Sequence, residues 1–261
     1  MKIVSLSFFR DQASQYEIEA CGENRGRFFS NFMPSLIRAW WAVWGSEWSL
    51  EIAHDDRVKE LNSWPLLLEL ERRSLIRLRD FGVSQTLCGS MLERMHPIYQ
   101  DGVEVVVCRD IDSLPMHRDK VMVEQFIASR GIVHSIHDSE SHSGVMGGTL
   151  AVKAPAFRER IPREMFEQAK NAWDLRIHGS DQDFLNTVIY PKILDAWVVH
   201  SRRPMITRPH MRLYPVAPQV TELDKIVRHV GAGYDTAKCL EVLSRMEYPH
   251  KSEIEECASC I

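Results

Sequence analysis

The chain of 261 residues has the composition of an ordinary globular protein, with 44% hydrophobic and 26% charged residues. It is long enough to bury a core as one large α/β domain or two small ones. Its formal net charge of −4 argues against general nucleic-acid binding, which needs a basic surface. No apolar run approaches the roughly 20 residues of a membrane helix. Arg10 and Asp11 interrupt the apolar start before it reaches the length of a secretory signal. We therefore expect no nucleic-acid partner, no transmembrane segment and a cytoplasmic location.

The first part of the chain alternates predicted strands with predicted helices. Runs of apolar and β-branched residues favour strands, and apolar residues at helical spacing favour helices. A polar segment at 10–26 reads as a loop, and the aromatic residues of 28–44 read as the core-facing side of a helix. The expected strands are 2–9, 48–54, 75–78 and 103–107, and the expected helices are 28–44, 60–73 and 87–95.

The same alternation continues to about residue 200 and then weakens. The expected strands are 132–136, 149–152 and 196–199, and the expected helices are 118–129, 162–173, 180–190, 223–230 and 237–246. Prolines break the pattern beyond residue 202. There is no internal repeat, no low-complexity tract and no linker. We therefore predict one mixed α/β domain over 1–200 with a mainly helical extension over 201–261 packed on it.

The six cysteines are scattered, which predicts reduced core residues instead of a disulfide framework. Cys257 and Cys260 form the only close pair, and no second pair or suitably spaced histidine accompanies them to make a zinc site. We interpret this pair as part of a frayed polar tail without a function.

Asp110 and Asp112 follow the buried run 103–107 directly. In open α/β sheets, ligands bind outside the carboxyl ends of the strands. Side chains at positions i and i+2 of a strand point the same way, so both acids can address one site. Carboxylates suit Mg²⁺ or Mn²⁺, with phosphate oxygens and water as the remaining ligands. The alternative is that the aspartates only cap a turn. We predict a metal and diphosphate site.

These residues also carry a resemblance to a known family. The block 106–113, Val-Val-Cys-Arg-Asp-Ile-Asp-Ser, resembles the R-D-x-D-S signature of a glycosyltransferase family with the GT-A fold, found in bacteria and large DNA viruses. A helix with a charged start, a stretch like 134–139, a Gly-Gly turn at 147–148 and a G-x-D-Q-x-F-L block at 179–185 follow in the family's order. The match covers roughly residues 1 to 200. It implies a GT-A-like, Rossmann-like domain with a mixed, mostly parallel sheet flanked by helices.

The resemblance implies a metal-dependent glycosyltransferase that moves a sugar from a nucleotide-diphosphate sugar to a hydroxyl acceptor, a glycan or another small molecule. Asp110 and Asp112 would hold Mn²⁺ or Mg²⁺ on the diphosphate. His200 would complete the metal shell by its position near the end of the domain, with His210 as the fallback, and imidazole favours Mn²⁺. The nucleotide would be cradled by Ser5 and Ser7 of the first strand and by Asp55 and Asp56, which follow the second.

The remaining candidates concern the sugar and its acceptor. Asp181 and Asp138 could deprotonate the acceptor hydroxyl if the reaction inverts the sugar. Asp181 begins a predicted helix, where Asp183 is better explained as a capping residue. Gly147 and Gly148 would let the backbone approach the donor sugar closely. Arg94 and Arg109 are candidate diphosphate contacts, because a guanidinium fork suits phosphate, and each could instead be an ordinary ion-pair partner.

Two other functions stay open at this point. The run from Asp110 to Leu114 is also similar to the nucleophile motif of haloacid dehalogenase-like phosphatases, although that motif normally lies on the first strand of its domain. A non-catalytic nucleotide-sugar-binding protein on the same scaffold is the second, because a fold does not fix a function. Neither the donor sugar nor the acceptor can be read from the sequence.

Overall fold

The computed structural model describes residues 1–9, 24–61, 63–83, 85–140, 142, 144–202, 211–226, 230 and 236–259. These residues form one eight-stranded sheet with the order β3-β2-β1-β4-β6-β5-β7-β8. The strands are β1 Lys2–Phe8, β2 Trp48–His54, β3 Arg77–Asp80, β4 Val105–Asp110, β5 Val133–His137, β6 Leu150–Lys153, β7 Trp197–Ser201 and β8 Arg212–Pro215. Only β6 runs antiparallel to its neighbours, β4 and β5, so the sheet is mixed and mostly parallel, as predicted.

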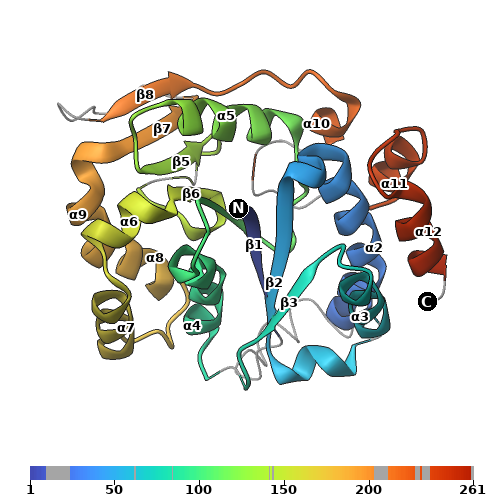
Figure 1. Ribbon diagram of the computed structural model, residues 1–261, viewed down its shortest axis with the longest axis horizontal. Coiled ribbons are helices and arrows are strands. Elements are labelled where there is room, and N and C mark those ends of the chain that lie inside the picture. Colours follow the sequence, from blue (N-terminus) through green and yellow to red (C-terminus); the bar gives the residue numbers. More distant parts are fainter. Residues whose placement is uncertain are drawn as a thin grey trace.

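Helices cover both faces of the sheet (Figure 1). One face packs against α2 Asn24–Trp44, α3 Trp64–Arg72, α5 His117–Ala128, α10 Glu222–Ile226, α11 Thr236–Ser244 and α12 Lys251–Ser259. The other packs against α4 Leu87–Leu92, α6 Ala154–Arg160, α7 Arg163–Ala172, α8 Ser180–Phe184 and α9 Tyr190–Ile193. We call these the α5 face and the α4 face. Burial on both sides explains why the central strands read as continuous apolar runs.

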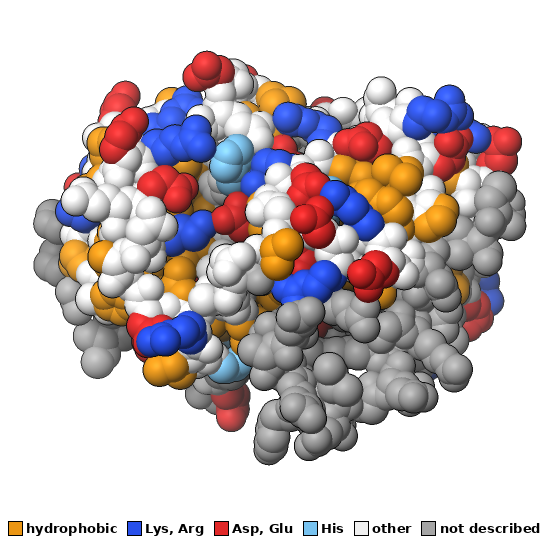
Figure 2. Space-filling view, turned by 90° about the horizontal axis from the view of Figure 1, so that it is seen from below, with side chains coloured by type: hydrophobic (Ala, Val, Ile, Leu, Met, Phe, Trp, Pro, Cys, Tyr) orange, Lys and Arg blue, Asp and Glu red, His pale blue; other side chains and the backbone are white. Residues whose placement is uncertain are grey.

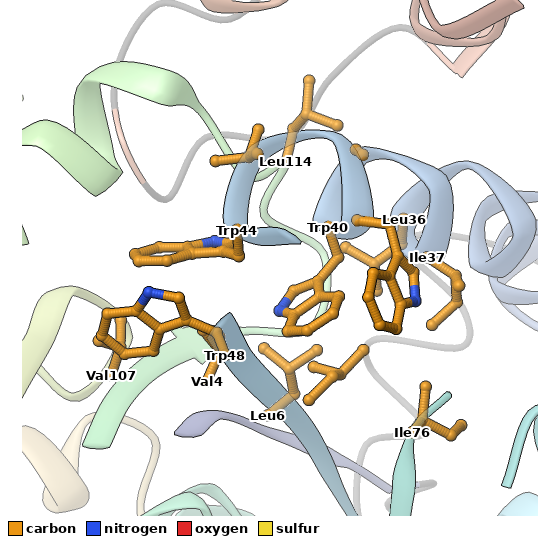
Figure 3. Close-up of a cluster of buried hydrophobic side chains, with 14 of the residues drawn as sticks. Val4, Leu6, Leu36, Ile37, Trp40, Trp44, Trp48, Ile76, Val107 and Leu114 are labelled. Carbon is orange, nitrogen blue, oxygen red and sulfur yellow. The ribbon is translucent and has the colours of Figure 1, made fainter. Parts of the chain in front are cut away.

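The aromatic stripe of α2 forms the centre of the core on the α5 face, as the sequence predicts. Trp40 and Trp44 are each 1% exposed and lie over Val4 and Leu6 of β1. Figure 3 shows both indole rings layered between the helix and the strands, with Trp48 of β2 beside Trp44. The Trp44 and Trp48 ring centroids are 4.8 Å apart in an edge-to-face arrangement, which suits the aromatic quadrupole.

The structure differs from the sequence prediction at several element ends. The helix expected from residue 28 begins at Asn24, inside the predicted loop, and residues 10–23 of that loop lie outside the described part. The helix expected over 180–190 is divided into α8, a π-helical turn Leu185–Ile189 and α9. The short helix α6 and the strand β8 were not predicted.

The C-terminal part packs on the same sheet and its helices. Strand β8 pairs in parallel with β7, α11 packs against α2, and α12 packs against α2 and α3. The prediction of a frayed tail is wrong for the described residues, because Ile254 and Cys257 form a buried stripe on α12 at 1% and 2% exposure. Cys260 lies outside the described residues. Within the described chain, every helix is too short or too polar to cross a membrane.

Candidate functional site

Several of the candidate residues lie at the carboxyl edge of the sheet, which around β1 and β2 faces downwards in Figure 1. Strands β1, β2 and β4 are parallel, so their last residues, which are Phe8, His54 and Asp110, all lie at this edge. Because β6 runs the other way, the turn that precedes it, Gly147–Thr149, lies at the same edge. Figure 2 looks onto this edge from below and shows acidic and basic side chains interspersed with hydrophobic ones. This is the place where open α/β sheets bind ligands.

Asp110 and Asp112 are both accessible at this edge, but only Asp110 belongs to a strand. Strand β4 ends at Asp110, and the Ser113 amide donates to the Asp110 carbonyl at 3.1 Å, which closes a turn. The Asp110 side chain is 40% exposed, and Asp112 is exposed in the turn. The expectation that the two acids share a strand face is therefore wrong. Asp is favoured at the first position of such a turn, so the strand ends at Asp110. The prediction required the strand to continue to Asp112.

Arg94 connects Asp110 to the rest of the site. It is 4% exposed and projects from the 3-10 helix Glu93–Tyr99, which follows α4. Its Nη1 forms an ion pair with Asp110, and its Nη2 lies 3.9 Å from the Asp181 carboxylate. Burial acts to lower the pKa of the Arg94 guanidinium, but the Asp110 and Asp181 carboxylates outweigh it, so this pKa is raised. Arg94 is therefore a fixed positive charge between two carboxylates.

The glycine turn lies directly against this cluster. A Cβ on Gly147 would lie 2.9 Å from Nη2 of Arg94, and a Cβ on Gly148 would lie 2.6 Å from Cγ of Asp110. Real Cβ atoms essentially never come closer than 3.0 Å, so side chains at both positions would collide with the charged groups. The absence of side chains here is what lets the backbone approach Asp110.

The G-x-D-Q block contains the Asp181 carboxylate and also a residue that holds the segment before the glycine turn. Asp181 lies in the first turn of α8, 6% exposed, after Gly179 with its positive φ of 86°. The next residue, Gln182, donates its side-chain amide to the Val145 carbonyl. Asn186 accepts from the Val145 amide at 2.9 Å and donates to the Val145 carbonyl at 3.2 Å. The segment leading into the glycine turn is thus held by Gln182 of this block and by Asn186, which directly follows it, whereas Asp183 is exposed.

Arg109 does not lie with Asp110. Its side chain is buried on the α5 face and forms two bonds with Asp119 of α5, at 2.8 Å and 2.6 Å. It also donates to the carbonyls of Cys108 at 2.6 Å and Leu150 at 2.9 Å. The structure corrects the expectation of a diphosphate contact, because these protein acceptors engage the guanidinium on the far side of the sheet. Arg109 ties β4, β6 and α5 together.

The four residues that we expect to bind the nucleotide lie at the carboxyl edge of the sheet or are buried next to it. Ser7 pairs in register with Asp110, and its hydroxyl donates to the Met91 carbonyl at 3.4 Å. Ser5 is fully buried further back, and its Oγ has no hydrogen-bond partner among the described residues. Asp55 is buried and accepts from the Val58 amide at 3.2 Å and from Arg57 at 3.0 Å. The neighbouring Asp56, with a 45% exposed side chain, forms an ion pair with Lys59 at 2.7 Å.

His200 lies on the α5 face, so it is not available to a metal near Asp110. Its Nδ1 is 2.8 Å from Nε2 of His134, and its Nε2 is 2.8 Å from Oε1 of Gln125. With both ring nitrogens engaged and the ring fully buried, no nitrogen remains for a metal, which corrects the expectation of a metal ligand. Burial lowers the pKa of His200 to about 4, so the ring is neutral. The fallback, His210, lies outside the described residues.

The structure also contradicts the prediction that Asp138 is a catalytic base. Its side chain has no exposure and forms an ion pair with Arg118 at 2.8 Å. The Val230 amide donates to the same carboxylate oxygen at 2.9 Å, and His142 lies 3.6 Å from the other oxygen. A general base must reach the proton it removes, and this carboxylate is enclosed. Asp138 joins β5 to α5 and to the C-terminal part.

The residues around Asp110 fit a divalent cation shared with a diphosphate. Mg²⁺ and similar cations are held through one or two carboxylates together with substrate phosphates. Asp110 supplies such a carboxylate, Asp112 follows it in the exposed turn, and Gly148 leaves the space beside Asp110 free of a side chain. Among the described residues, no group of three or more His, Cys, Asp and Glu side chains is placed to hold a metal by itself. Phosphate oxygens would therefore have to complete the shell.

Comparison with known proteins gives matches at the level of structure. No protein-family model and no curated protein matches the sequence. The apo-form glycosyltransferase GlyE of Streptococcus pneumoniae TIGR4 aligns with a TM-score of 0.52 and 11% identity, over 99% of this chain and 63% of that chain. A second GlyE crystal structure aligns with a TM-score of 0.50 and 10% identity over the same shares. The chain thus spans less than two thirds of these structures. At this identity the likeness concerns the fold, and the expected GT-A-like α/β fold is confirmed.

Proposed function

We propose that the protein is a metal-dependent glycosyltransferase that moves a sugar from a nucleotide-diphosphate sugar to a hydroxyl acceptor. The observation that carries this proposal is the convergence of Asp110, Arg94, Asp181 and the Gly147–Gly148 turn at one edge of a GT-A-like sheet. These residues are far apart in the sequence and come from four separate segments. The arrangement offers carboxylates for a cation, a guanidinium for phosphate oxygens and backbone space for a sugar.

Asp110 and Asp112 would hold Mg²⁺ or Mn²⁺, and the cation, when bound, neutralises charge on the departing diphosphate. Arg94 lies beside Asp110 and bears a permanent charge that can also contact the diphosphate. The buried Asp181 carboxylate lies 3.9 Å from Nη2 of Arg94, which orients it. In an inverting reaction, Asp181 accepts the proton of the acceptor hydroxyl as that oxygen bonds to the anomeric carbon and the bond from this carbon to the diphosphate oxygen breaks, which releases the nucleoside diphosphate.

The metal and donor assignment is tested by nucleotide binding. A panel of nucleotide sugars is titrated with Mn²⁺ by calorimetry, and thermal shift provides a second readout, since a bound ligand raises apparent stability. Asp110→Asn and Asp112→Asn should abolish metal-dependent binding and still unfold cooperatively. Asp183→Asn removes a carboxylate that is exposed on α8, so it is the matched control and should bind like the wild type. Unchanged nucleotide affinity in both site variants defeats the assignment.

Turnover separates the transferase from its alternatives. Asp181→Asn should lower the transfer rate by about 10²–10⁴-fold, the range for a lost general base, while donor affinity stays near that of the wild type. Metal-dependent release of phosphate from p-nitrophenyl phosphate without any nucleotide sugar would favour the haloacid dehalogenase-like phosphatase. Nucleotide-sugar binding with neither transfer nor hydrolysis across the acceptors tested would favour a non-catalytic binding protein.

A further inference from the structure

An open groove of about 550 Å³ lies beside the candidate site at the same edge of the sheet. One wall consists of described residues between β3 and α4 together with residues of α4, including Phe81, Thr86 and Ser90. The other wall is the end of α7 and the following segment, residues 170–176. The volume falls in the range of about 300–1,000 Å³ that is usual for small-molecule sites. None of the residues assigned above to the donor and the metal lines it.

The groove and the candidate site share their framework. Glu93 lines the groove, and the next residue is Arg94, which contacts Asp110 and Asp181. Across the groove, the Leu175 carbonyl accepts from the Cys88 amide of α4 at 3.3 Å, and the Ile177 carbonyl accepts from the Cys88 thiol at 3.1 Å. The chain that forms the second wall then runs on into α8, which begins at Ser180. A ligand in the groove would therefore lie next to the elements that position both carboxylates.

The charges that line the groove cancel within it. Its charged lining residues are Glu93, Lys170, Asp174 and Arg176. Lys170 pairs with Glu93 at 2.6 Å, and Arg176 pairs with Asp174 at 2.8 Å. A phosphate or nucleotide site needs cations that are left for the ligand, and the lining described here leaves no net charge. Ion pairs of this kind still offer both donors and acceptors to hydroxyl groups.

The rest of the lining combines aromatic and neutral polar groups. Phe81 and Trp173 are partly exposed in the groove, and Gln85 and Asn171 carry exposed amide side chains. The exposed Val83 extends the apolar surface at the rim, at 57% exposure. A pyranose ring presents C–H groups on its faces and hydroxyls around its edge, so it matches aromatic surfaces flanked by amides and ion pairs. Because the charged lining residues are paired and sum to no net charge, the lining does not favour a charged ligand over a neutral one.

We propose that this groove is the acceptor subsite and that it takes a neutral saccharide whose hydroxyl receives the sugar. This inference rests on the proposed transferase function, because only that reaction needs a second substrate next to Asp181. It adds the chemical class of the acceptor, which neither the sequence nor the comparisons supply.

The test fills the groove without touching the donor site. Ala172 is exposed and lines the groove, so Ala172→Trp should block it. Gln168→Trp is the matched control, since Gln168 is exposed one turn earlier on α7 and is not part of the lining. Asn171→Ala, which removes an amide and adds no bulk, is a second groove variant in case the tryptophan disturbs folding. Lactose, maltose and cellobiose serve as neutral probes, sialyllactose as the anionic counterpart, and nucleotide sugars with Mn²⁺ report the donor site.

The expected result is that at least one neutral disaccharide binds the wild type and Gln168→Trp. Ala172→Trp should weaken that binding by about tenfold or more, which is about 1.4 kcal/mol. Asn171→Ala should weaken it in the same direction, sialyllactose should bind less well than lactose, and the donor affinity of both groove variants should remain that of the wild type. Equal disaccharide affinity in the wild type and both groove variants overturns the inference. Lost donor affinity in Ala172→Trp overturns it as well, because the groove would then belong to the donor.

The inference and the proposed function fail in different ways. A wild-type protein that binds no nucleotide sugar defeats the proposed function, whatever the disaccharides do. A wild-type protein that binds nucleotide sugars but none of the neutral disaccharides defeats the groove assignment and leaves the donor site standing.

Discussion

Gly148→Ala gives the most direct test of the geometry around Asp110. An alanine Cβ at this position would lie 2.6 Å from Cγ of Asp110 and closer still to one of its oxygens. For its nearest oxygen to reach an ordinary contact of 3.4 Å, the carboxylate must retreat by about 1.5 Å. Gly148 has no positive φ, so the alanine backbone itself is unstrained. The substitution therefore acts on the position of Asp110 and not on the turn.

The size of the effect follows from this displacement. Overpacking at a tight position costs about 1–3 kcal/mol of folding stability, and here the partly exposed Asp110 can move, which favours the lower end. Function should suffer more, because a misplacement of about 1 Å at a reacting centre can cost about 10²-fold in rate. We expect Gly148→Ala to fold cooperatively, to lose metal-dependent nucleotide affinity and to transfer sugar about 10²-fold more slowly.

The assays are calorimetric titration of nucleotide sugars with Mn²⁺, initial transfer rates, and urea denaturation. Gly147→Ala is the matched control, because its Cβ would lie 2.9 Å from the end of the long Arg94 side chain and not from Asp110. It should weaken binding less than Gly148→Ala does. If Gly148→Ala folds and keeps wild-type nucleotide affinity and rate, the close approach of the turn to Asp110 has no part in the site and the reasoning fails.

Three further predictions concern the α5 face. Arg109→Met breaks the buried ion pair with Asp119, whose side chains are 6% and 3% exposed, so it should lower the free energy of unfolding by about 3–5 kcal/mol in urea denaturation. Adding Asp119→Leu should restore part of the lost stability. A loss below about 1 kcal/mol in Arg109→Met would contradict a structural role for this ion pair. Burial lowers the pKa of His200 to about 4 and that of His134 well below 6.5, so the unfolded chain binds protons that the folded chain does not. The stability they contribute should be complete above pH 6.5 and decline as the pH falls toward 4, and His200→Gln should flatten that slope in denaturation midpoints. Trp40→Ala should cost about 3–5 kcal/mol, because the side chain is 1% exposed in the core, and a thermal midpoint near that of the wild type would count against this packing.

The strands could be predicted from the sequence because both faces of the sheet are covered. A strand buried on both sides needs a continuous apolar run, and such a run is visible at Val105–Cys108 without any structure. The elements that were missed lack this signal. Strand β8 is Arg-Leu-Tyr-Pro, largely exposed at the sheet edge, where a proline is tolerated. Among the described side chains of α12, Ile254 and Cys257 are the buried ones and most of the others are charged, so the pattern is easily taken for a polar tail.

The site was predicted as a set of segments but not as a set of contacts. The resemblance brought together Asp110, the glycine turn and Asp181, and the structure places all three around Arg94. The contact between Arg94 and Asp110 crosses between two elements whose packing no local pattern fixes. The groove beside α4 was invisible for the same reason, because its two walls meet only in the folded chain.

The alternation of side chains between the two faces of the sheet explains which site predictions are right and which are wrong. Side chains alternate across a strand, so Arg109 must point away from the face that carries Asp110. Likewise, Val198 and His200 of β7 point to the α5 face, where His200 meets Gln125 of α5. The alternation can be predicted from the sequence, but the sequence does not show which face holds the candidate site. The α4 face holds Ser7, Asp110, Arg94 and Asp181, and the α5 face holds buried polar pairs that fix the strands. Substitutions of the buried polar pairs on the α5 face should therefore change stability before donor affinity, and substitutions of Asp110 on the α4 face should do the reverse.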